Sequence, residues 1–109
     1  MNAKKLQKII IKNLEDNKAQ DVVALDIHKI TDIADYMIIA SGNSSRQLKA
    51  LTKHLIEALK ANEANFISVE GDNDSEWILI DSGYIIVHLM LPEVRKFYAL
   101  EKLWSDFNN

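Results

Sequence analysis

The feature that most constrains the fold is the stretch from residue 76 to residue 90, which reads EWILIDSGYIIVHLM. Two runs rich in β-branched and aromatic residues flank the pair Ser82-Gly83. Such runs on either side of a short polar pair predict two antiparallel strands joined by a two-residue turn. Glycine suits the turn because it adopts positive φ angles without steric cost. We therefore expect a β-hairpin here, with the rest of the fold built around it.

A turn at Ser82-Gly83 fixes an expected register. It places Asp81 opposite Tyr84, Leu79 opposite Ile86, and Trp77 opposite His88. Because side chains alternate between the two faces of a strand, one face is purely aliphatic and is expected to face the core: Ile78, Ile80, Ile85, Val87 and Leu89. The other face mixes apolar side chains with polar tips: Trp77, Leu79, Asp81, Tyr84, Ile86, His88 and Met90. A register slip of one residue would swap the two faces.

The mixed face of the hairpin allows two interpretations. In the first, a helix of the same chain covers it and the polar tips find local partners, because Trp and Tyr are largely buried on average. In the second, part of the face stays open and binds another protein, because Trp, Tyr and Met are enriched in interfaces while Lys and Glu are depleted. The face contains no lysine. An exposed apolar surface would also suit a homodimer of the free protein.

Hydrophobic spacing predicts three helices outside the hairpin. The first spans residues 3–17, where apolar residues recur at helical spacing, and Asn17 is expected to end it in a left-handed conformation. The second follows a Ser-Gly-Asn-Ser loop, with Asn43 or Ser44 as its cap. The third is short and partly apolar and begins at Pro92, which suits the first turn of a helix.

Three further strands are predicted, at residues 21–27, 36–40 and 65–69. The second of these is nearly all apolar, which is typical of a strand buried on both faces. Together with the hairpin, these elements predict an α/β (α+β) domain with a single mixed sheet of about five strands flanked by helices.

Length, composition and charge limit the class of protein. The chain has 109 residues, 48 % of them hydrophobic, so residues 1–109 are expected to form one domain with its own core. It contains no cysteine, its first 20 residues lack the apolar run of a signal peptide, and no stretch approaches the ~20 apolar residues of a membrane span, so a cytoplasmic protein is expected. The net charge of −3 predicts little direct contact with RNA, since phosphate contacts need a basic surface.

Carboxylates gather around the hairpin, at Glu70, Asp72, Asp74, Glu76, Asp81 and Glu93. Such a run is typical of a solvated loop, and it would also steer the encounter with a basic partner. No residue pattern predicts catalysis, a cofactor or a metal site. The Ser-Gly-Asn-Ser loop matches neither a P-loop nor a dinucleotide fingerprint, and the carboxylates from residue 72 onward lack the glycine and distal glutamate of a calcium loop.

Several segments, taken together, resemble one family. They are DYMIIASGNSSRQ at residues 35–47, Glu-Gly at 70–71, WILIDSG at 77–83, Val-His at 87–88 and RKFYALEKLW at 95–104. In their order and spacing they closely resemble the ribosomal silencing factor (Iojap) family over nearly the whole chain. The resemblance implies a nucleotidyltransferase-like topology without catalytic activity. Accordingly, no Asp-x-Asp metal pair follows the Ser-Gly turn in the usual place.

The family resemblance also implies a function. It implies a translational repressor that binds the large ribosomal subunit through ribosomal protein L14 and sterically prevents the small subunit from joining when nutrients are scarce. Two alternatives stay open: a large-subunit assembly factor acting at the same place, and a nucleotide-binding enzyme on this fold.

The mixed hairpin face and the family role together predict a partner-binding surface. Its apolar patch is expected to comprise Trp77, Leu79, Tyr84, Ile86, His88 and Met90, with Glu70, Asp72 and Asp81 on the rim. The segment 41–44 is interpreted as a turn and helix cap. Arg46 is expected to pair with a carboxylate such as Asp81 or Glu101.

Overall fold

The computed structural model describes residues 2–71 and 74–106. Within these ranges the elements are α1 (Ala3–Asp16), β1 (Gln20–Asp26), β2 (Tyr36–Ser41), α2 (Ser45–Ala61), β3 (Ser68–Glu70), β4 (Trp77–Asp81), β5 (Ile85–Met90), α3 (Pro92–Tyr98) and α4 (Leu100–Asp106). The strands form one five-stranded sheet of order β1-β2-β5-β4-β3, in which β2 and β5 are parallel and the other pairs antiparallel. This mixed sheet confirms the predicted α/β class. No helix of the described ranges is both long and apolar enough to cross a bilayer.

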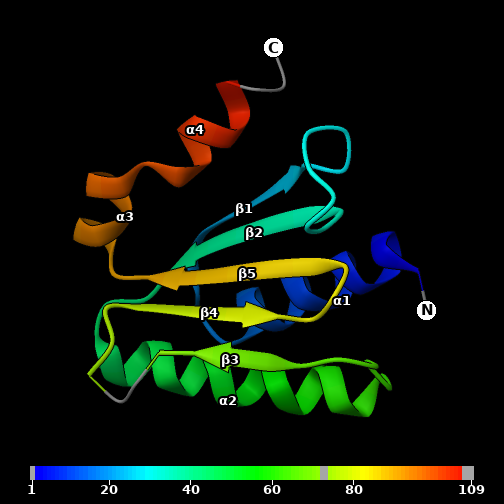
Figure 1. Cartoon of the computed structure of the whole chain (residues 1–109). Helices are drawn as coiled ribbons and strands as arrows, with labels where there is room; N and C mark the ends of the chain where they lie inside the picture. The colour runs from blue at the N-terminus through cyan, green and yellow to red at the C-terminus, as the bar shows by residue number, and fades with distance from the viewer. Residues whose placement is uncertain (1, 72–73, 107–109) are drawn as a thin grey trace.

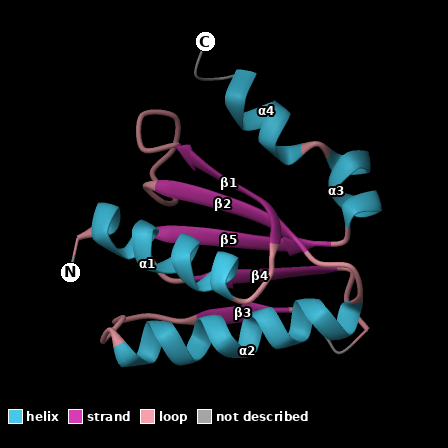
Figure 2. Cartoon of the chain, turned by 180° about the vertical axis from the view of Figure 1, so that it is seen from behind, coloured by secondary structure: helices cyan, strands magenta, loops and turns pink. Residues whose placement is uncertain are grey.

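The helices divide unequally between the two faces of the sheet. The long helices α1 and α2 pack side by side on one face (Figure 1), and the view from behind in Figure 2 shows them in front of the strands. The short helices α3 and α4 follow β5 and lie toward the β1 and β2 side of the sheet, so β3 and β4 are uncovered by helix on the face seen in Figure 1.

The main core lies between the sheet and the long helices. It is formed by the aliphatic stripes of α1 and α2 and by the aliphatic face of the hairpin, with central members that are completely buried: Ile10, Leu14, Leu48, Leu55, Leu59, Ile80, Ile85, Val87 and Leu89. Burial of one such side chain stabilises the fold by about 1.5–3 kcal/mol. The predicted core face of the hairpin is therefore confirmed, as is the burial of β2 on both faces.

Polar side chains define the helix ends. Asn2 accepts a hydrogen bond from the Lys5 backbone N–H at the start of α1, and Ser44 accepts one from Gln47 at the start of α2, which confirms Ser44 as the cap. The predicted left-handed stop at Asn17 is wrong. Asn17 has φ −99°, and both its backbone and its side-chain N–H groups donate to the Asn13 carbonyl. The left-handed residue is Lys18, at φ 70°.

The hairpin register differs from the prediction by two residues. Trp77 pairs with Met90, Leu79 with His88, and Asp81 with Ile86. The Ser82 backbone N–H and hydroxyl both donate to the Ile85 carbonyl, and the carbonyl of Tyr84 accepts from two N–H groups of the segment entering β2. The bonds from Ser82 to Ile85 close a longer turn than predicted, so strand pairing starts with Asp81 opposite Ile86. Because the shift is by an even number of residues, the residues of β4 and β5 keep their predicted faces. Tyr84, predicted on the mixed face, lies in the turn before β5 instead.

Two other predicted elements have different limits. The expected strand at 65–69 is observed at Ser68–Glu70, because its partner strand β4 ends at Asp81, opposite Ser68. The expected single C-terminal helix is split into α3 and α4 by Ala99, which adopts φ 48° and donates its N–H to the Arg95 carbonyl. This left-handed residue redirects the chain, so α4 does not continue the axis of α3.

Candidate functional site

The mixed face of the hairpin is partly covered and partly open. A second, smaller core lies on this side of β1, β2 and β5, where Val94, Leu100 and Trp104 of α3 and α4 pack. Met90 is completely buried there and His88 is 6 % exposed. The other members of this face on β4 and β5, Trp77, Leu79, Asp81 and Ile86, are only half-buried. The first interpretation, burial under helices of the same chain, therefore holds for Met90 and His88. Part of the face stays open, and its binding to another protein stays a prediction.

An aromatic stack crosses from the sheet to α3. The ring centroids of Trp77 and Tyr98 are 5.0 Å apart, and those of Phe97 and Tyr98 are 5.1 Å apart in an edge-to-face arrangement. Tyr98 is 53 % exposed and Phe97 is 81 % exposed. Exposed aromatic side chains next to a half-buried tryptophan are typical of interface anchors. We call Trp77, Phe97, Tyr98 and Leu79 the aromatic surface.

The sequence prediction did not include Phe97 and Tyr98 in the site. One signal was available, because neighbouring residues of a helix point about 100° apart and two consecutive aromatic side chains rarely both face the core. The pattern could not show which of the two lies beside Trp77, since that depends on the unpredicted helix break at Ala99.

A partly buried hydrogen bond orients the tryptophan ring. The Trp77 indole N–H donates to Nδ1 of His88 at 2.9 Å. Because indole is only a donor, this Nδ1 must be unprotonated. Burial lowers the pKa of His88 from 6.5 to about 4, which is consistent with a neutral ring at neutral pH. His88 and Met90 thus lie beneath the aromatic surface and support it.

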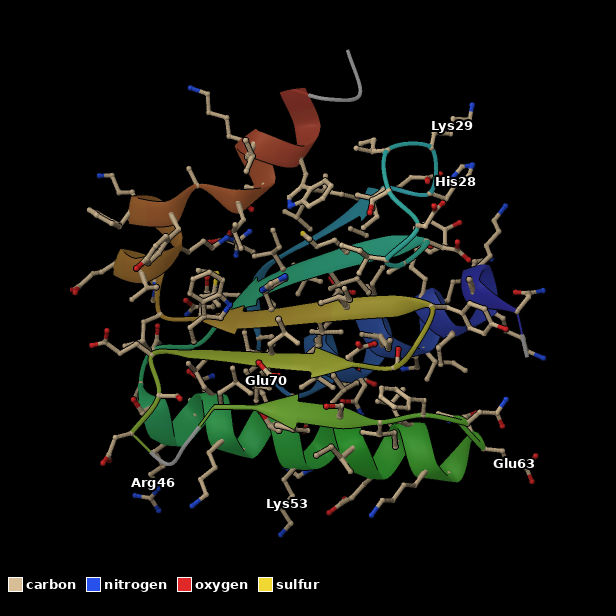
Figure 3. All side chains as sticks on the ribbon, viewed as in Figure 1. His28, Lys29, Arg46, Lys53, Glu63 and Glu70 are labelled. Carbon is tan, nitrogen blue, oxygen red and sulfur yellow. The ribbon has the colours of Figure 1, made fainter. Side chains whose placement is uncertain are left out.

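Acidic residues lie beside the aromatic surface. Glu70 is exposed on β3, pairs with Leu79 of β4, and is labelled on β3 in Figure 3. With Gly71, Trp77 and Leu79 it lines a shallow hollow of about 250 Å³. The Asp81 carboxylate accepts the Gly83 N–H at 2.8 Å and so also shapes the hairpin turn. Asp72, the third predicted rim residue, lies outside the described residues.

Tyr84 is separate from the rest of the predicted patch. It is 54 % exposed and lines a hollow of about 370 Å³ together with Leu6, Phe66 and Gly83. This hollow lies at the turn end of the hairpin, where Trp77 does not reach, because Trp77 pairs with the last residue of β5. The structure therefore does not bring Tyr84 and Trp77 together.

A buried arginine holds the two short helices in place. Arg95 of α3 is 7 % exposed and donates to both carboxylate oxygens of Glu101 in α4, with distances of 2.6 to 3.1 Å. It also donates to the Ser41 hydroxyl at the end of β2, at 2.9 Å. The predicted pairing of Arg46 with Glu101 or Asp81 is wrong, because Glu101 pairs with Arg95 and Asp81 bonds to the turn backbone.

Among the described residues, no group of three or more His, Asp or Glu side chains is arranged to hold a metal ion. Asp26 and His28 hydrogen-bond to each other at the surface, and this bond lowers the pKa of the Asp26 carboxyl. The Ser41 hydroxyl accepts a hydrogen bond from Arg95. Fold and site define a small mixed α/β domain with an aromatic, acid-flanked surface on one side of its sheet.

Comparison with known proteins identifies the family. The profile described as "Ribosomal silencing factor during starvation" matches residues 1–109, so the chain belongs to the ribosomal silencing factor family. It is 40 % identical to ribosomal silencing factor RsfS of Chromobacterium violaceum, over 96 % of this chain and 86 % of the relative. A crystal structure of a Chromobacterium violaceum protein superposes with a TM-score of 0.92 at 40 % identity, covering 96 % of this chain and 88 % of that one.

A more distant relative carries a different name. The chain is 33 % identical to "Mitochondrial assembly of ribosomal large subunit protein 1" of Mus musculus, over 89 % of this chain and 44 % of the mouse protein. Both the silencing and the assembly names concern the ribosome.

Proposed function

We propose that this protein is a translational repressor of the cytoplasm that binds the large ribosomal subunit through ribosomal protein L14. Occupation of that surface sterically prevents the small subunit from joining, and translation is thereby reduced when nutrients are limiting. Membership of the silencing factor family supports this function. The whole of residues 1–109 acts as one domain in this proposal.

The observation that carries the proposal is the aromatic surface. Trp77, Tyr98 and Phe97 form a continuous stack, and the rings of Tyr98 and Phe97 are more than half exposed. The long helices leave this face uncovered. Between Lys60 and Arg95 the sequence has seven carboxylates and no lysine or arginine. An aromatic patch inside an acidic region suits a basic protein, with the aromatic anchors supplying affinity and the carboxylates raising the association rate.

Binding of Trp77→Ala to isolated large subunits tests the proposal. Removal of a central aromatic anchor is expected to weaken binding by about 2 kcal/mol, or roughly 30-fold. Phe66→Ala is the matched control, because Phe66 is 53 % exposed but lines the separate hollow near Tyr84. Circular dichroism is to be measured on both variants to check that they are folded. Equal affinity of the two variants and the unmodified protein contradicts the assignment of this surface.

The repressor mechanism needs a second measurement. Sucrose gradients with both purified subunits are expected to show fewer joined ribosomes when the protein is added, and no such decrease with Trp77→Ala. Binding to large subunits without any change in joining would reject the steric mechanism while keeping the surface.

The name of the mouse relative favours a second candidate function, in assembly of the large subunit at the same site. Cells lacking the protein would then accumulate immature large subunits under nutrient-rich conditions. Normal maturation together with excess subunit joining during starvation favours the repressor. We also infer that the protein is not an enzyme, and nucleotides are accordingly expected to leave its melting temperature unchanged.

A further inference from the structure

Charge is divided unevenly between the helix layer and the rest of the chain. Helices α1 and α2 carry eight lysine and arginine side chains and three carboxylates, a net charge of +5 in a chain whose total is −3. The loops and strands from β3 to β5 carry carboxylates and no lysine or arginine. The small net charge therefore combines a basic helix layer, α1 and α2, with an acidic region from β3 to β5.

All four cations of α2 lie along one flank of that helix. Arg46, Lys49, Lys53 and Lys60, here called the basic flank, are all exposed. They line a shallow hollow of about 660 Å³ along the helix, whose other lining residues are Ala50, Thr52, Ile56 and Glu57. Figure 3 shows Arg46 and Lys53 extending away from the sheet. From the first to the last cation, the flank is about 21 Å long at 1.5 Å per helical residue.

The cations of the basic flank are free to bind an external anion. In the part of the chain that the structure describes, none of the four forms an ion pair within 4.0 Å. On α1, by contrast, Lys12 is paired with Asp16 one helical turn later. Glu57 is the single carboxylate in the lining of the hollow.

We propose that the basic flank of α2 contacts the phosphodiester backbone of RNA. Four unpaired cations in a row match a linear polyanion, and phosphate contacts release condensed counterions without reading sequence. The inference rests on the proposed function, because the RNA would be that of the large subunit. Net charge alone predicted little direct contact with RNA, whereas the position of the charges favours it.

The placement of α2 makes two simultaneous contacts feasible. In Figures 1 and 2, α2 runs alongside the edge strand β3 on the covered side of the sheet. The hollow formed by Glu70, Gly71, Trp77 and Leu79 lies on the other side of the same edge. A protein bound to the aromatic surface would therefore leave the basic flank accessible to a neighbouring stretch of RNA.

Binding of the full chain to a fluorescent RNA duplex, measured at several salt concentrations, tests the inference directly. The double variant Lys49→Gln/Lys53→Gln is expected to bind about tenfold more weakly and to reduce the slope of log affinity against log salt by about two, one for each lost phosphate contact. The control is Lys4→Gln/Lys5→Gln, which makes the same change in net charge on α1 and is expected to change the slope little.

The same variants on isolated large subunits separate the inference from the proposed function. Trp77→Ala is expected to weaken binding without changing the salt slope, and Lys49→Gln/Lys53→Gln to reduce both affinity and slope. If the double variant matches its α1 control in both assays, the inference is overturned, while the Trp77 result still decides the function. If the unmodified protein does not bind large subunits, the function fails and the duplex assay alone decides the inference. Displacement by polyglutamate but not by RNA would assign the flank to an acidic peptide and overturn the inference.

Discussion

The two faces of the hairpin are made by alternate residues of the same strands, yet they are buried to different extents. The aliphatic face lies under α1 and α2, helices of 14 and 17 residues, and its members are at most 4 % exposed. The mixed face is met by α3 and α4, which have seven residues each. Two-turn helices cannot cover a five-stranded sheet, so Trp77 and Leu79 are left half-buried. Alternation thus determines which side a residue takes, and the length of the covering helices determines how far it is buried.

Alanine variants of the neighbouring residues Ile80 and Leu79 give the largest expected test of the difference in burial between the two faces. Ile80→Ala is expected to lower the free energy of unfolding by about 3–4 kcal/mol, because it leaves a cavity in the completely buried core. Leu79→Ala, one residue earlier on the other face, is expected to cost about 1 kcal/mol, since its side chain is only partly removed from water. Urea denaturation measures both changes. Equal losses would show that the mixed face is packed as tightly as the core.

Protonation of His88, on the mixed face of the hairpin, is expected to lower the free energy of unfolding. The folded-state pKa of about 4 lies below the ordinary value of 6.5, so the unfolded chain binds the proton more readily. The stabilisation is therefore complete above pH 6.5 and is lost as the pH falls toward 4, with a total of about 3 kcal/mol. Denaturation at several pH values is expected to show a weaker acid dependence in His88→Gln, whose carbonyl can still accept the indole N–H.

The control for this pH effect is His54→Gln, which removes an exposed histidine of α2. Its acid dependence should match that of the unmodified protein. If His88→Gln and His54→Gln lose stability in parallel between pH 6.5 and 4, the neutral buried histidine is not the source of the effect.

The sequence predicts the covered face far better than the open one, and the reason is physical. Hydrophobic alternation is a local property, so the core members of the hairpin and their side of the sheet were correct despite a register error of two residues. The open face depends on interactions between distant segments. The predicted register places Trp77 directly opposite His88, whereas the observed bond joins diagonal neighbours. The contact of Tyr98 with Trp77 needs the left-handed turn at Ala99.

The bonds of Arg95 to Ser41 and Glu101 are a second case of contacts that local sequence patterns do not predict. Arg95 and Ser41 are 54 residues apart in sequence, and neither position carries a periodic signal. A lysine or arginine in a helix is usually a surface residue, so pattern alone assigns Arg95 to solvent. Its burial follows from how β2, α3 and α4 meet, which was outside what local patterns can determine.

Weakening the Arg95–Glu101 pair should alter the packing of α3 and α4 and leave α1 and α2 intact. Glu101→Gln removes the negative charge beside buried Arg95 and is expected to cost about 1–2 kcal/mol, less than for a fully buried pair because Glu101 is 33 % exposed. Glu93→Gln is the matched control, an exposed carboxylate in the first turn of α3. Near-ultraviolet circular dichroism of Trp77 and Trp104 should change in the first variant only. Unchanged stability and spectra in both would show that the Arg95–Glu101 pair does not hold the short helices in place.

Phe97→Ser is expected to have the smallest effect on stability and still to weaken binding. Phe97 is 81 % exposed, so Phe97→Ser should alter the free energy of unfolding by less than about 0.5 kcal/mol. Its ring nevertheless packs edge-to-face on Tyr98, and a partner bound to the aromatic surface would bury it. Binding to large subunits should therefore weaken several-fold while urea denaturation stays the same. A loss of stability without a loss of binding would mean that Phe97 serves the fold, and that the open face ends at Tyr98.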